Sequence, residues 1–232
     1  MAEKPKVKAP QKRATPSKGT GTDRRLLIIG GAVAVLVVLV AGGFFLLGAG
    51  DSGTSADEVR ATLEAADCTM TVKPAVANVS DHSDFPDPDG RSDKWNTDPP
   101  TSGPHYGETL IYGAYTDPPQ IGRVLHNLEH GAVYILYGDE VPESTVAELQ
   151  GFYDQHKNGT ILAPYPRLGD KIALGAWYAA GLPEASSDRG SGILAECTAF
   201  DEAAFAAFFD AFQFKGPESE IFRPSDMTPG SN

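Results

Sequence analysis

The sequence predicts a mixed domain of the α+β or α/β class, a two-layer sandwich in which helices cover a small sheet, preceded by one transmembrane helix. Two patterns predict the sandwich. Short apolar segments bounded by Gly and Pro are typical of strands, and segments with apolar residues at helical spacing lie between and beside them. A third pattern, a long uncharged run near the N-terminus, predicts the transmembrane helix. A length of 232 residues, with 22% charged and 41% hydrophobic, allows one globular domain plus such extras.

Residues 26–50 form the uncharged run, which contains 25 consecutive residues without Asp, Glu, Lys or Arg. This length is enough to cross a hydrocarbon core of about 30 Å. A cleaved signal peptide is the alternative, but the apolar region of a signal is usually only about 7–15 residues long. The sequence therefore predicts an uncleaved membrane anchor at 26–50.

Residues 1–25 carry eight Lys and Arg against two acidic residues. This bias places the N-terminus in the cytoplasm and the C-terminal domain outside the cell membrane, as a single-pass protein. The tail has too few apolar residues to bury a core, so we expect a disordered basic segment. The remaining chain carries 11 basic and 29 acidic side chains, which excludes nucleic acid as a partner on grounds of charge.

The expected location outside the membrane decides how the two cysteines, Cys68 and Cys197, are interpreted, because that compartment is oxidising. An even number of cysteines in an oxidising compartment, without metal-type C-x-x-C spacing, favours one disulfide over free thiols or soft metal ligands. In the chain-entropy model, closing so long a loop is worth about 5 kcal/mol.

The helices and strands of the exported part follow in order. Residues 51–67 are a linker and a juxtamembrane helix over about 55–66, and 69–98 is predicted to be irregular. Beyond the central segment, strands are expected at 132–137, 160–163 and 171–178, and helices at 143–157 and 199–214. Thr198 is the expected N-cap of the last helix, which carries the core residues Phe205, Phe208, Phe209 and Phe212.

Within this exported part, the domain itself is expected to span 68–225, with a flexible C-terminus at 226–232. Thioredoxin-like and ferredoxin-like arrangements both fit the order of elements.

Histidines cluster in residues 97–137, where His105 precedes an H-x-x-E-H run formed by His126, Glu129 and His130. Imidazole is the commonest transition-metal ligand in proteins. If 126–130 is a helical turn, the two histidines share a face at i, i+4 and Glu129 lies beside them. If the run is extended, the histidines still share a face and Glu129 points away.

The segments NTDPPTSGPHYGETLIYGAY and HNLEHGAVYILY resemble the DUF3105 family of bacterial proteins, many of them membrane-anchored and actinobacterial. The resemblance covers about 68–225 and rests on PPTSGPHY and on LEHG next to an apolar strand. An upstream histidine of the family matches His82. The family has no established activity, so the resemblance implies a fold and a histidine site without a reaction.

Three functions fit these residues. The leading one is a copper or zinc site without catalysis, formed by His105, His126 and His130 with His82 and Glu129. The second is an accessory subunit of a membrane or envelope protein complex, with structural histidines. The third is a metal-dependent hydrolase, because H-x-x-E-H is the inverted zinc-protease signature. That chemistry requires a long helix, which Gly131 and the following strand should end, so we favour a protein that is not an enzyme.

Overall fold

The computed structural model describes residues 56–76, 92–179 and 189–232, which belong to one compact unit over Gly53–Asn232. The predicted tail at 1–25, the predicted membrane helix at 26–50 and His82 all lie outside the described residues. None of the helices in the described ranges combines the length and the apolarity needed to cross a bilayer.

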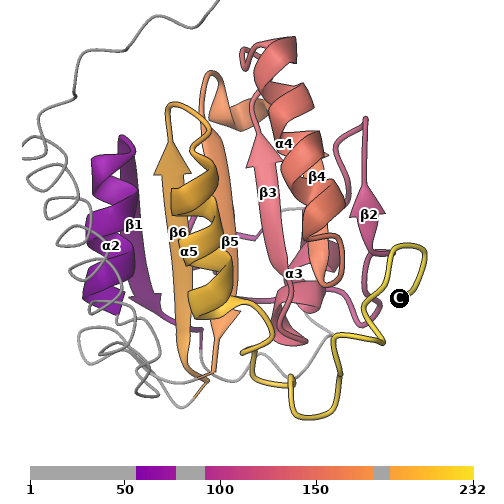
Figure 1. Cartoon of the computed structure of the whole chain (residues 1–232). Coiled ribbons are helices and arrows are strands. Elements are labelled where there is room, and N and C mark those ends of the chain that lie inside the picture. The colour runs from indigo at the N-terminus through magenta and orange to yellow at the C-terminus, as the bar shows by residue number, and fades with distance from the viewer. Residues whose placement is uncertain (1–55, 77–91, 180–188) are drawn as a thin grey trace, which may run out of the picture. The chain divides into compact units, whose positions relative to one another are not determined.

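The centre of the domain is a mixed sheet of six strands (Figure 1). In spatial order the strands are β1 (Cys68–Pro74), β6 (Ser191–Cys197), β5 (Ile172–Tyr178), β3 (Val133–Tyr137), β4 (Thr160–Pro164) and β2 (Gly113–Ala114). The pairs β1–β6, β6–β5 and β5–β3 are antiparallel, whereas β3–β4 and β4–β2 are parallel. The expected α+β sandwich is therefore confirmed at the level of a mixed sheet covered by helices.

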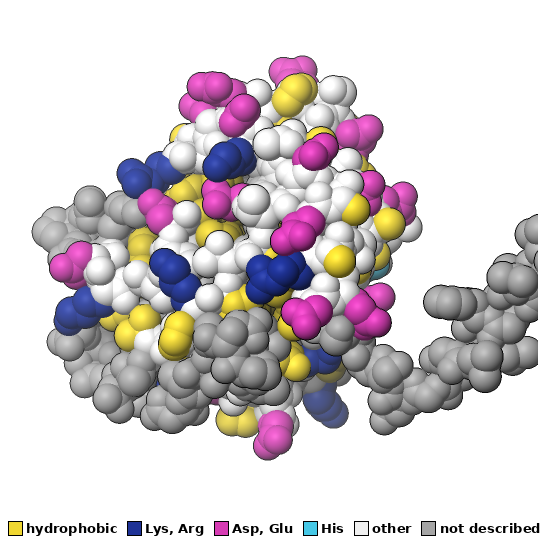
Figure 2. All heavy atoms as spheres, turned by 90° about the vertical axis from the view of Figure 1, so that its left-hand side faces the viewer, with side chains coloured by type: hydrophobic (Ala, Val, Ile, Leu, Met, Phe, Trp, Pro, Cys, Tyr) yellow, Lys and Arg dark blue, Asp and Glu magenta, His cyan; other side chains and the backbone are white. Residues whose placement is uncertain are grey.

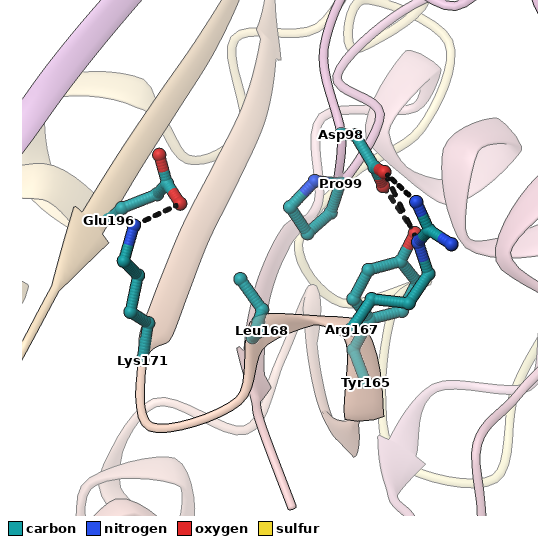
Figure 3. A pocket seen from close by; sticks show the side chains of 7 residues that line it. All are labelled: Asp98, Pro99, Tyr165, Arg167, Leu168, Lys171 and Glu196. Atoms are coloured by element: carbon teal, nitrogen blue, oxygen red, sulfur yellow. Dashed lines mark hydrogen bonds and ion pairs between the residues drawn. The ribbon is translucent and has the colours of Figure 1, made fainter.

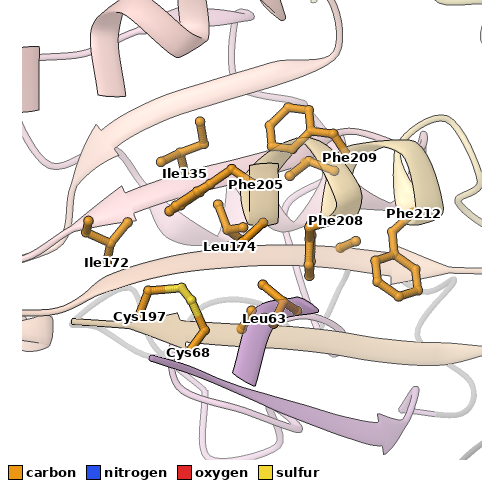
Figure 4. Close-up of a cluster of buried hydrophobic side chains, with 14 of the residues drawn as sticks. Leu63, Cys68, Ile135, Ile172, Leu174, Cys197, Phe205, Phe208, Phe209 and Phe212 are labelled. Carbon is orange, nitrogen blue, oxygen red and sulfur yellow. A yellow bond between two sulfur atoms is a disulfide. The ribbon is translucent and has the colours of Figure 1, made fainter. Parts of the chain in front are cut away.

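Three helices cover one face of the sheet: α2 (Ala56–Ala65), α4 (Glu143–Gln155) and α5 (Glu202–Phe212) (Figure 1). The phenylalanines of α5 pack there against Ile135 and Leu174, next to the Cys68–Cys197 disulfide (Figure 4). The predicted disulfide and the predicted phenylalanine core are both confirmed. Because Val59 and Leu63 of α2 pack in the same core, this helix is part of the domain and not a separate connecting segment.

The opposite face is covered by α3 (Ile121–Glu129) and by turn-rich segments that include residues 95–112. Apolar residues of α3 pack against Tyr134, Leu136 and Trp177 of the sheet. Both faces are thus buried, and the second face carries His105, His126 and His130.

Two strands were missed by the sequence patterns. The expectation that 69–98 is irregular was wrong at its start, because Cys68–Pro74 forms the edge strand β1. Its partner β6, with the sequence SGILAEC, was not predicted to be a strand. The seven-residue register between them begins at Cys68 opposite Cys197, so pairing across the sheet decides both strands.

The ends of the domain also differ from expectation. Helix α5 begins with Asp201 as its N-cap, whose carboxylate accepts a hydrogen bond from the Ala204 amide at 2.8 Å, and Thr198 has no part in it. Residues 226–232, expected to be flexible, lie against the domain. Met227 is buried there, and the Tyr112 amide donates to the Ser231 carbonyl at 2.8 Å.

The surface beside α2 and β1 carries charges of both signs. Figure 2 shows Lys and Arg side chains interspersed with Asp and Glu on that face. The described residues therefore form no continuous basic surface there. The exclusion of nucleic acid stays a prediction from charge.

Candidate metal centre

Helix α3 positions two of the histidines. Its residues Val124, Leu125 and Leu128 are buried against the sheet, which fixes the rotation of the helix about its axis. The helix ends at Glu129, His130 is its C-cap, and Gly131 follows with φ of 102°. The helical interpretation of H-x-x-E-H is therefore correct and the extended one is wrong.

His105 reaches the same place from a proline- and glycine-rich turn. Gly103 has φ of 134°, and a Cβ there would lie 2.8 Å from the Trp95 ring, so glycine is required. His105 is fully buried. Its Nδ1 lies 2.8 Å from the Gly103 carbonyl oxygen and its Nε2 lies 3.1 Å from Oε2 of Glu129.

The tautomers of two histidines follow from backbone carbonyls. A carbonyl oxygen only accepts, so Nδ1 of His105 donates to Gly103, and Nδ1 of His126 donates to the Tyr106 carbonyl at 2.8 Å. In a neutral His126 ring, Nε2 then carries the lone pair that could bind a metal ion, whereas Nε2 of His105 faces Oε2 of Glu129. The rings lie 5.1 Å apart between centroids.

Glu129 is 1% exposed and lies between two basic groups. Its Oε2 faces His105, and its Oε1 accepts a hydrogen bond from the Arg189 guanidinium. Burial by itself raises the pKa of Glu129. The hydrogen bond from His105 and the nearby His105, Arg189 and His126 outweigh this effect, and the net pKa lies below its usual value. Glu129 is therefore a carboxylate at neutral pH.

Ligand atoms gather in two overlapping groups. The inner triad is His105, His126 and Glu129, all buried, and the outer triad is His126, His130 and Glu218. Within each triad one ligand atom from every residue lies within 4.8 Å of the others. Such groups could hold a metal ion. Among the described residues, no such group contains all three predicted histidines.

The outer triad adds a residue that sequence reasoning missed. Nε2 of His130 lies 3.5 Å from Oε2 of Glu218, and the His130 ring stacks on Phe222 with centroids 3.5 Å apart. The backbone amide of Glu218 donates to the Glu129 carbonyl at 2.9 Å. Nothing in the spacing of Glu218 connects it to α3, so the sequence alone offered no signal for it.

Residues 89–224, more than half of the chain, match the family model DUF3105, described as a protein of unknown function. The chain belongs to the DUF3105 family. The matched range contains both triads, whereas His82 and the β1 cysteine precede it. No curated protein and no solved structure matches the chain.

The fifth histidine of this DUF3105 chain, His156, lies apart from both triads. It follows α4 and stacks on Phe152 with ring centroids 4.2 Å apart, and it also contacts Phe209. Its ring is therefore packed against phenylalanines and only partly exposed.

A separate pocket of about 300 Å³ lies near the start of β5 (Figure 3). Its walls carry two ion pairs, Lys171 with Glu196 at 3.3 Å and Arg167 with Asp98 at 2.9 Å. The charged groups of the pocket are paired with one another. It shares no lining residue with the triads, and we assign it no ligand.

Proposed function

We propose that this DUF3105 protein binds one transition-metal ion, zinc or copper(II), at the inner triad. One observation carries the proposal. One ligand atom from each of His105, His126 and Glu129 lies within 4.8 Å of the others. Nδ1 of both histidines and Oε1 of Glu129 have partners of their own, which leaves the two Nε2 atoms and Oε2 as the atoms that could bind an ion. Metal-binding histidines in proteins are oriented in this way, by donating their second N–H to a carbonyl or carboxylate.

One separation between ligand atoms fits a small ion, and the others are no longer than 4.8 Å. Zinc binds imidazole nitrogen at about 2.0–2.1 Å and carboxylate oxygen at about 2.0–2.2 Å, which separates tetrahedral ligands by roughly 3.4 Å. The His105–Glu129 separation of 3.1 Å is close to that value. A nitrogen and oxygen donor set suits zinc and copper(II) better than calcium or magnesium.

The inner triad should also attract a cation, because two of its electron-rich atoms face each other. Because Nδ1 of His105 donates to Gly103, a neutral ring would point the lone pair of Nε2 at a carboxylate oxygen. Two acceptors facing each other in a buried place repel, so a proton or a metal ion belongs between them. A metal ion bound between Nε2 of His105 and Oε2 of Glu129 would satisfy both atoms at once.

The arrangement favours binding over hydrolysis. In the inverted zinc-protease signature the glutamate acts on an attacking water. Here Glu129 is engaged by both His105 and Arg189, and α3 ends at Glu129 instead of supporting the run from both sides. We therefore infer a metal-binding protein without catalysis.

The proposal includes its location in the cell. The uncharged run at 26–50 and the basic tail before it support a single-pass anchor with the domain outside the membrane. The Cys68–Cys197 disulfide suits an oxidising compartment. An anchored domain of this kind also suits an accessory subunit of a membrane or envelope complex, with the metal or the histidine network stabilising its fold.

The test is metal analysis of the full-length chain, purified in mild detergent without a histidine tag and then exposed to Zn²⁺ or Cu²⁺. We expect close to one ion per chain. The variants His126→Ala and Glu129→Gln should each bind more than about 100-fold more weakly, because even the outer partners of metal ligands are typically worth about 10–100-fold. The matched control is His156→Ala, which removes a histidine outside both triads.

Binding should also raise the stability of the folded protein. A ligand present at 100 times its dissociation constant stabilises the folded state by about 2.7 kcal/mol, so the unfolding temperature should rise with Zn²⁺ in the wild type and not in Glu129→Gln. A wild type that binds no ion, with His126→Ala less stable, would show instead that the histidines are structural.

A further inference from the structure

The two triads differ in their access to water. His105 is fully buried and Glu129 is 1% exposed, whereas His126 and His130 are 8% exposed and the Glu218 side chain is 36% exposed. Exposure therefore rises from the inner to the outer triad along one continuous set of ligand atoms. An ion that enters the buried site from this side meets Glu218 first.

His126 belongs to both triads and can serve only one ion at a time. Its Nδ1 donates to the Tyr106 carbonyl, which leaves one lone pair, on Nε2. Two ions cannot share that lone pair. The triads are therefore alternative positions for a single ion, and His126 can remain bound while the other ligands change.

Glu218 is held in place by the backbone. Its amide donates to the Glu129 carbonyl at 2.9 Å, and the Phe214 amide donates to the Gly131 carbonyl at 2.7 Å. These bonds fix the segment that carries Glu218 to the C-terminal end of α3. The stacked Phe222 ring fixes the plane of His130 on the same side. The outer triad is thus a built arrangement rather than a chance meeting of exposed side chains.

We propose that the outer triad is a loading position, at which a divalent transition-metal ion is captured and passed through His126 to the inner triad. The inference rests on the proposed function, because it assumes that the inner triad binds the ion. Glu218 and His130 first replace water molecules on the ion. His105 and Glu129 then replace Glu218 and His130, while the Nε2 bond of His126 persists and the ion keeps its charge.

Two consequences distinguish a loading position from an ordinary ligand. Glu218 should speed both capture and release, because it lies on the path in both directions. The dissociation constant of the inner triad, in contrast, should not depend on Glu218. Faster capture and faster release of the ion would both suit a protein that exchanges the ion with a partner molecule. Such a partner would offer metal-binding side chains of its own.

The experiment compares Glu218→Gln with wild type, in the full-length metal-free chain in mild detergent. Stopped-flow mixing with Zn²⁺ and a chromophoric chelator measures loading and removal, and competition at equilibrium gives the dissociation constant. Loss of a carboxylate that attracts the ion should slow loading about 10-fold, the lower end of the range for electrostatic steering. Removal should slow by the same factor, and the dissociation constant should stay at the wild-type value.

The control is Glu220→Gln, the same change at an exposed position two residues further along the segment, which should load like wild type. Equal loading rates in Glu218→Gln and wild type would overturn the inference and leave the proposed function standing. A dissociation constant weakened as much as in Glu129→Gln, or two ions bound per chain, would also overturn it. Absence of zinc in the wild type would overturn the proposed function itself, and the inference with it.

Discussion

At Gly216 the missing side chain decides how closely the segment that carries Glu218 approaches α3. A Cβ at this position would lie 2.5 Å from the Glu129 carbonyl oxygen and 2.5 Å from the Gly131 amide nitrogen. Both neighbours are backbone atoms at the end of a helix packed on the sheet. They cannot move aside in the way that a flexible side chain can.

The variant Gly216→Ala should therefore lower the free energy of unfolding by about 1–3 kcal/mol, the usual cost of overpacking. Urea unfolding of the metal-free protein measures the change. Gly151→Ala is the matched control, because a Cβ there meets no atom within 4 Å. Equal stability of Gly216→Ala and wild type would mean that this segment is not held tightly against α3.

At the same scale, the candidate ligands show what a sequence can predict. The density of imidazoles near H-x-x-E-H singled out His105, His126, Glu129 and His130, and the structure brings these residues into two neighbouring groups. The sequence did not indicate which of these residues belong to the inner triad and which to the outer triad. That division depends on the partners of Nδ1 in His105 and His126 and on the direction in which each Nε2 atom faces. Glu218 comes from a distant segment and gave no signal.

Among the secondary-structure elements, α4 contains a glycine with no packing role. Gly151 lies in the middle of the helix, is exposed, and has open space where its side chain would be. Glycine in a helix interior lowers stability relative to alanine because it loses more conformational freedom on folding.

We accordingly expect Gly151→Ala to raise the free energy of unfolding by about 0.5–1 kcal/mol, with no change in metal binding. Thermal or urea unfolding checks the first statement and zinc titration the second. A destabilised variant would contradict the open environment seen at this position.

Helices and strands with strong local periodicity were predicted well, whereas strands that depend on pairing with a distant strand were not. Helices α4 and α5 and strands β3, β4 and β5 lie within two or three residues of their predicted ranges. Strand β1 was missed because CTMTVKP has a mixed pattern on an edge of the sheet, where one side of the strand has no neighbour. Its assignment depends on the register with β6.

At the scale of the whole molecule, the disulfide links two neighbouring strands that are far apart in the sequence. Cys68 and Cys197 are 129 residues apart and face each other at one end of the β1–β6 pair. They join the edge strand, next to α2, to the strand that leads into α5. The bond thus restricts most of the chain in the unfolded state.

Replacing both cysteines, in Cys68→Ala/Cys197→Ala, should lower the free energy of unfolding by about 5 kcal/mol according to the loop-entropy relation. Urea unfolding with and without a reductant measures this. Reductant should destabilise the wild type by a similar amount and leave the double variant unaffected. Unchanged stability of the double variant would show that the unfolded chain is compact without the bond.

The sequence by itself determined the approximate fold class of this protein and most residues of its candidate site. Apolar periodicity predicted a mixed domain, cysteine number predicted a disulfide, and histidine density indicated the region of the side chains that could hold a metal ion, because each is a property of local residue order. Only the tertiary structure decided the six-strand order, the division of ligands into inner and outer triads, and the place of Glu218. These depend on contacts between segments far apart in the chain, and such contacts leave no pattern in local spacing.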